Sequence, residues 1–90
     1  MDFASLPGGD FVERGLADLA AGKESVESLT LRVGSRRLRE LGFPVTEGAT
    51  DPGHALYLRL IAEDPRRGYS RYNALLRRLS SFQRAARCAL

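Results

Sequence analysis

The chain has 90 residues, 43% of them hydrophobic and 28% charged, and a formal net charge of +3. This composition is typical of one small globular domain and argues against wholesale disorder. A single cysteine excludes an intramolecular disulfide framework. No apolar stretch approaches the roughly 18 residues of a membrane-spanning helix, and Met1-Asp2-Phe3 does not resemble the cationic start of a signal peptide. We therefore expect a cytoplasmic protein.

The sequence predicts a loosely ordered leader over residues 1–9 and a single helical domain over residues 10–90. Asp10 and Glu13 stand three positions apart just before an apolar periodic segment, which is the spacing of a capping box. We therefore predict a first helix over residues 11–21 that begins at this capping box.

Residues 23–42 give two competing patterns. Leu29, Leu31 and Val33 alternate as in a strand, whereas Val26, Leu29 and Val33 also lie on one face of a helix. The pattern alone leaves residues 29–33 open between helix and strand. A lone strand would have no partner for its backbone hydrogen bonds, so we predict a helix.

Gly34 is expected to interrupt this segment, with Ser35 capping a second short helix that runs to Leu41. Two short helices meeting at a glycine are also typical of a helix-turn-helix motif, and the second one carries Arg36, Arg37 and Arg39. The second helix is barely two turns long, however, and its start lacks the usual buried apolar residue. We therefore favour an ordinary helical corner with a solvated basic face.

Two further helices complete the expected fold, which is all-α: a compact bundle of about four helices with a long amphipathic basic C-terminal helix. After a loop over residues 45–50, Asp51 and Pro52 supply the N-cap and first position of a helix that ends before Pro65. The turn at residues 66–68 then leads into the last helix.

The C-terminal segment is the most distinctive part of the chain, because residues 65–90 hold seven arginines and no acid. Its apolar residues fall in one stripe at helical spacing: Tyr69, Tyr72, Leu75, Leu76, Leu79, Phe82, Ala86 and Leu90. Arg77 and Arg84 lie on one flank of this stripe, and Arg71 and Arg78 lie on the other. Both flanks are therefore expected to be basic.

Residue types that carry catalysis or bind metals are scarce. The chain has one histidine, His54, and one cysteine, Cys88, and they lie on different predicted helices. A metal site needs several such ligands at defined spacing, and nucleophilic catalysis needs a base beside the nucleophile. We therefore predict no enzyme, no metal and no cofactor.

Two functions remain open. The first is a small non-enzymatic protein-interaction module that uses part of the C-terminal stripe for self-association or for another protein; the predicted contact residues are Tyr69, Tyr72, Leu75, Leu76, Leu79 and Phe82. The alternative is a protein that binds nucleic-acid backbones, with Tyr69 and Tyr72 available for stacking if exposed. Its predicted contacts are Arg71, Arg77, Arg78, Arg84 and Arg87. The plainest reading is that the stripe fills the domain's own core and the arginines are solvated. No membrane contact is expected.

Overall fold

A computed structural model describes residues 3–46, 48 and 51–89. Helices account for all regular structure in these residues, and no strand occurs among them. In chain order the elements are η1 (Phe3–Ser5), α1 (Gly9–Ala20), α2 (Val26–Val33), α3 (Ser35–Glu40), α4 (Pro52–Glu63) and α5 (Gly68–Ala89). The all-α prediction is confirmed, and residues 29–33 are helical. Of the predicted loop, residues 47, 49 and 50 lie outside the described residues.

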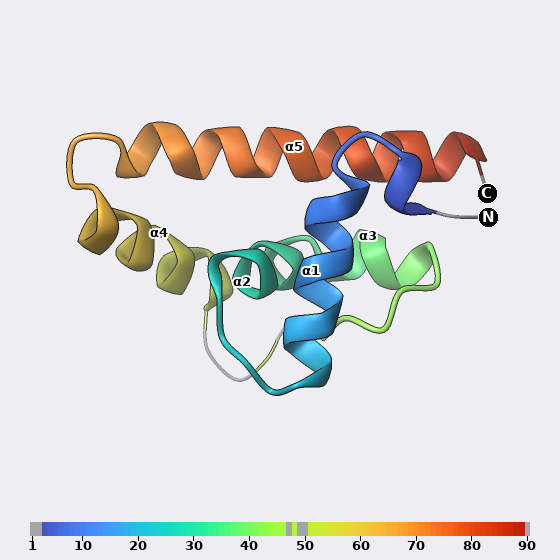
Figure 1. Cartoon of the computed structure of the whole chain (residues 1–90), viewed down its shortest axis with the longest axis horizontal. Helices are drawn as coiled ribbons and strands as arrows, with labels where there is room; N and C mark the ends of the chain where they lie inside the picture. The colour runs from blue at the N-terminus through green and yellow to red at the C-terminus, as the bar shows by residue number, and fades with distance from the viewer. Residues whose placement is uncertain (1–2, 47, 49–50, 90) are drawn as a thin grey trace.

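The long helix α5 organises the molecule. Its 22 residues span about 33 Å at 1.5 Å per residue, close to the 38 Å longest dimension of the molecule. The other helices pack along one side of it, with α4 beside its N-terminal half and α3 beside its C-terminal half (Figure 1). Helix α1 crosses between them in front of α2. The opposite side of α5 is not covered by any described element.

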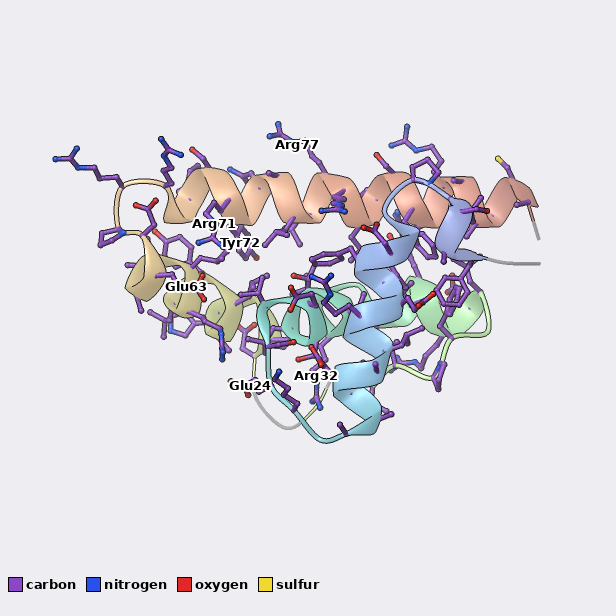
Figure 2. The ribbon with its side chains drawn as sticks, viewed as in Figure 1. Glu24, Arg32, Glu63, Arg71, Tyr72 and Arg77 are labelled. Atoms are coloured by element: carbon purple, nitrogen blue, oxygen red, sulfur yellow. The ribbon has the colours of Figure 1, made fainter. Side chains whose placement is uncertain are left out.

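The core consists of two clusters of buried side chains, and α5 contributes to both. The larger one joins α1, α2, α3 and α5 through Val12, Leu31, Leu38, Val45, Leu79, Phe82 and Ala86. The smaller one joins α2 and α4 through Leu29, Leu56 and Leu60, with Tyr72 and Leu75 of α5 packed against it. Figure 2 shows Tyr72 on the side of α5 that faces α4. The apolar stripe of α5 therefore lies mainly inside the protein.

Aromatic packing ties the start of the chain to this core. The Phe3 ring lies edge-on to Phe43 at 5.2 Å and to Phe82 at 6.1 Å between ring centroids, and Phe43 lies 5.7 Å from Phe82. Phe82 is fully buried. Of the leader expected over residues 1–9, residues 1 and 2 lie outside the described residues, while η1 is helical and its first side chain packs against the core.

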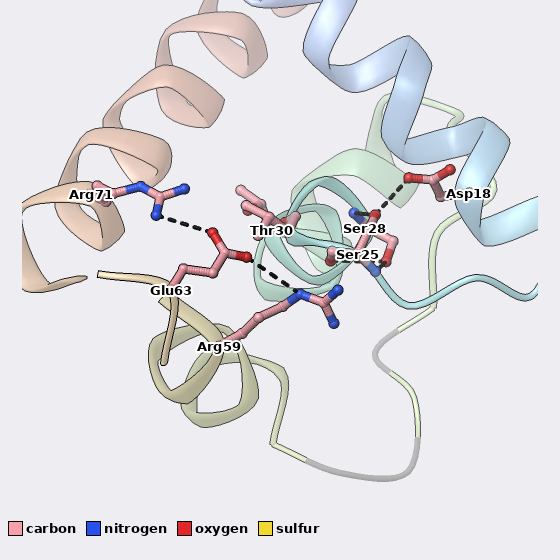
Figure 3. Close-up of polar contacts among 8 residues, drawn as sticks. Asp18, Ser25, Ser28, Thr30, Arg59, Glu63 and Arg71 are labelled. Carbon is pink, nitrogen blue, oxygen red and sulfur yellow. Dashed lines mark hydrogen bonds and ion pairs between the residues drawn. The ribbon is translucent and has the colours of Figure 1, made fainter. Parts of the chain in front are cut away.

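The helix starts differ in part from the predicted ones. The expected capping box at Asp10 is wrong: α1 begins at Gly9, and its N-cap is Gly8 in a left-handed conformation (φ 75°) without a side-chain cap. The capping box belongs to α2, where the Ser25 hydroxyl accepts from the Ser28 N–H and the Ser28 hydroxyl accepts from the Ser25 N–H. Ser25 also donates to Asp18 of α1 at 2.6 Å (Figure 3). These bonds fix the connection between α1 and α2.

The start of α3 differs from the predicted one, and the start of α4 agrees with it. Ser35 does not cap α3, because the N-cap is Gly34 and Ser35 is the first helical residue, buried in the structure. The start of α4 is as predicted. The Asp51 carboxylate accepts from the N–H groups of Gly53 and His54 at 3.0 and 3.2 Å, and Pro52 occupies the first helical position.

Candidate functional site

The six apolar residues predicted to bind a partner occupy three kinds of position. Leu79 and Phe82 are buried in the larger core cluster. Tyr72 and Leu75 pack against the smaller cluster and face α2 and α4. Only Tyr69, which is 65% exposed, and the half-buried Leu76 lie outside both clusters. Most of the stripe therefore packs against other helices of this chain.

One flank of α5 has its positive charges paired with acids from other helices. Arg71 donates to Glu63 of α4 at 3.1 Å, and Glu63 also pairs with Arg59 at 3.9 Å (Figure 3). Further along, Arg78 donates to Asp10 of α1 at 3.2 Å and lies over the Phe11 ring at 5.2 Å from its centroid. The positive charge of this flank is therefore largely offset by acids of α4 and α1.

The other flank carries positive charges without acidic partners. These charges belong to Arg77, Arg84 and Arg87 of α5. Together with Arg37 of α3, which lines the same groove as Arg84 and Arg87, we call them the basic flank. Within the described residues, no carboxylate oxygen lies within 4.0 Å of any of these guanidinium groups. Figure 2 shows Arg77 pointing away from the body of the protein. Both flanks of α5 thus carry arginines in the sequence, but only one flank has acidic partners among the described residues.

A groove of about 500 Å³ separates α3 from the C-terminal half of α5. Arg37, Arg84 and Arg87 line it, and Glu40 is the only acid among the described residues of its lining. Gln83, at the base of the same region, donates from Nε2 to the Gly34 carbonyl at 3.2 Å and thereby fixes α5 against the corner between α2 and α3. The groove is therefore a cationic surface of defined shape between two helices.

A shallow depression continues this surface toward the N-terminus of α5. Tyr69, Leu76 and Arg77 line it, and Ser80 belongs to both the depression and the groove. From Tyr69 to Arg87 the distance along the helix axis is about 27 Å at 1.5 Å per residue. One face of the molecule thus presents an exposed aromatic ring followed by a row of arginines.

Other residues considered from the sequence take no part in this surface. Arg36 pairs with Glu40 at 3.9 Å, and Arg39 donates to the Val45 carbonyl at 3.4 Å, so only Arg37 of the three α3 arginines lines the groove. Cys88 is exposed. In the part of the chain that the structure describes, no three His, Cys, Asp or Glu side chains gather as a metal site. No helix there is long and apolar enough to cross a membrane.

Three of the four arginines of the basic flank, Arg77, Arg84 and Arg87, are among the residues that the sequence suggests for nucleic-acid binding, and Arg37 is not. The sequence suggests a role for Arg37 only within a helix-turn-helix motif, and no local pattern indicates that α3 lies beside the end of α5. No known protein family, curated protein or solved structure matches the chain.

Proposed function

We propose that this protein is a non-enzymatic binding protein whose basic flank contacts the phosphate backbone of a nucleic acid. The observation that carries the proposal is the difference between the two flanks of α5. Arg71 and Arg78 are engaged by Glu63 and Asp10, whereas the four arginines of the basic flank have no carboxylate partner among the described residues.

Guanidinium groups suit this role because they are permanently charged and bind phosphate oxygens in a bidentate manner. Arg77 and Arg84 are seven residues apart, so they lie about 10 Å apart along the axis and on nearly the same side of α5. Arg37 adds a cation from across the groove. Such a row neutralises successive phosphates of one strand and releases their counterions, which is the main source of affinity in backbone binding.

Fluorescence anisotropy of labelled mixed-sequence DNA and RNA between about 50 and 200 mM salt tests the proposal. The double variant Arg77→Gln/Arg84→Gln should reduce the slope of log affinity against log salt by about one unit for each arginine that binds a phosphate in the natural protein. The control Arg71→Gln/Arg78→Gln removes the same charge from the opposite flank. It should retain the slope, provided circular dichroism shows an intact fold.

Two results would refute the assignment. Equal reductions of affinity in the two double variants would mean that only the net charge matters. The absence of binding at 50 mM salt would exclude a backbone-binding function altogether.

A second candidate function is self-association through the outward side of α5, favoured by one observation. Tyr69 is one of two large hydrophobic side chains exposed in the described residues, and it shares a depression with the half-buried Leu76. Light scattering over a range of concentrations tests this candidate. A dimer that becomes a monomer in the Tyr69→Ser/Leu76→Ser variant supports it, and a monomer at all concentrations excludes it.

A further inference from the structure

The exposed ring of Tyr69 lies at one end of the basic flank. We infer that the protein prefers single strands, with the arginines on the phosphates and one base stacked on Tyr69. This inference rests on the proposed function and names its ligand class.

The three tyrosines of the chain differ in what their rings contact. Tyr57 and Tyr72 lie edge-to-face with centroids 5.9 Å apart and an interplanar angle of 88°, and Tyr72 packs against the smaller core cluster. Tyr69 lies in the first turn of α5, is 65% exposed and belongs to neither core cluster. Of these three rings, that of Tyr69 is therefore the one open to a base.

A base can cover this ring only when its own faces are open. In a duplex each base is stacked between its neighbours, whereas a single strand can turn one base out onto an aromatic side chain. Leu76 lies two turns further along the same depression and adds apolar surface beside the ring. An exposed aromatic ring beside unpaired arginines is the combination that single-strand-binding surfaces use.

The spacing of the groups suits a flexible strand. Tyr69 and Arg77 are about 12 Å apart along the axis, and Arg84 and Arg87 follow within a further 15 Å or so. A strand that places one base on Tyr69 can therefore continue along α5 and present phosphates to Arg77 and then to the arginines of the groove. A duplex could use the arginines but would leave the ring uncovered.

The test compares a labelled mixed-sequence 20-nucleotide DNA as a single strand with the same sequence as a duplex, at about 50 mM salt. The single strand should bind more tightly. Tyr69→Ala should weaken its binding by about 5- to 150-fold, the effect of removing an aromatic ring on which a base stacks. The same variant should leave duplex binding unchanged, and Tyr69→Phe should bind the single strand as well as the natural protein does.

Leu58→Ala is the matched control, because Leu58 is 53% exposed and lies on α4, away from the basic flank. It should bind the single strand normally. Labelled polyglutamate of similar charge tests for an acidic protein ligand. The inference is overturned if polyglutamate binds as tightly as the single strand.

Failure of the inference and failure of the proposed function give different results. If the duplex binds at least as well as the single strand, or Tyr69→Ala has no effect while Arg77→Gln/Arg84→Gln still weakens binding, backbone binding stands and the preference for single strands is wrong. If neither nucleic acid binds, both are wrong.

Discussion

Arg78 of α5 donates a hydrogen bond to Asp10 of α1 at 3.2 Å, across 68 positions of sequence. Both side chains are substantially exposed, at 48% for Arg78 and 76% for Asp10, so the pair is screened by solvent. We predict that Asp10→Asn lowers the free energy of unfolding by less than about 1 kcal/mol. Urea denaturation measures this change. A decrease above about 2 kcal/mol would mean that the pair holds α1 in place far more strongly than exposed ion pairs do.

The packing of Phe3 leads to a second prediction. Phe3→Ala removes a half-buried ring that packs against Phe43 and Phe82, and we expect it to lower the free energy of unfolding by about 2 kcal/mol. This is less than the roughly 3 to 5 kcal/mol typical of fully buried aromatic rings. Leu58→Ala, which removes an exposed side chain, should change stability by less than about 0.5 kcal/mol. An unchanged stability for Phe3→Ala would indicate a loose leader, as the sequence suggests.

The helices were largely predictable because their signals are local. Apolar spacing located α1, α4 and α5, and Asp51-Pro52 fixed the start of α4. For α2 the spacing also fitted a strand, and the lack of a partner strand decided for a helix. Helix caps were harder, because several polar residues near a helix start fit the same pattern. Asp10 and Glu13 match the capping-box pattern better than Ser25 and Ser28 do, because the second residue of the box is usually Glu or Gln. In the fold, however, the box forms at Ser25 and Ser28, and Asp10 pairs with Arg78. Long-range contacts decide between such local alternatives.

The Ser25 cap gives a third prediction. Its hydroxyl accepts from the Ser28 N–H and donates to Asp18, so one side chain both caps α2 and links it to α1. We expect Ser25→Ala to lower the free energy of unfolding by about 1 to 2 kcal/mol, the usual cost of removing an N-cap. Chemical denaturation would detect this decrease. The exposed Ser81 on α5 provides the control, and Ser81→Ala should be close to neutral. Equal stabilities for the two variants would exclude a capping role for Ser25.

The sequence predicts which residue types make up the candidate site but not how they are arranged. The sequence shows arginines on both flanks of α5, but Glu63 and Asp10, which pair with one flank, come from α4 and α1. The sequence also left open whether Tyr69 is exposed, because this residue lies roughly 100° around the helix from the centre of the buried stripe, at about 100° per residue. In a sequence pattern a residue at the edge of a stripe looks like part of it. The fold shows which edge residues are covered and which remain exposed.

The last prediction concerns Glu40, the one acid among the described residues that line the α3–α5 groove. If the groove binds phosphates, this carboxylate repels them, and Glu40→Gln should tighten nucleic-acid binding by about 1.5- to 5-fold at low salt. The variant also removes the ion pair with Arg36, but that pair is long, at 3.9 Å, and highly exposed, so the fold should be unaffected.

Glu13→Gln is the matched control for this prediction, because it changes the net charge by the same amount at an exposed position on α1, outside the groove. Anisotropy titrations at about 50 mM salt compare the two variants. Tighter binding in Glu40→Gln alone places the phosphates at the groove, because a purely long-range effect of net charge would act on both variants alike. Equal tightening in both variants would mean that only the overall charge affects binding and that the groove does not contact the nucleic acid.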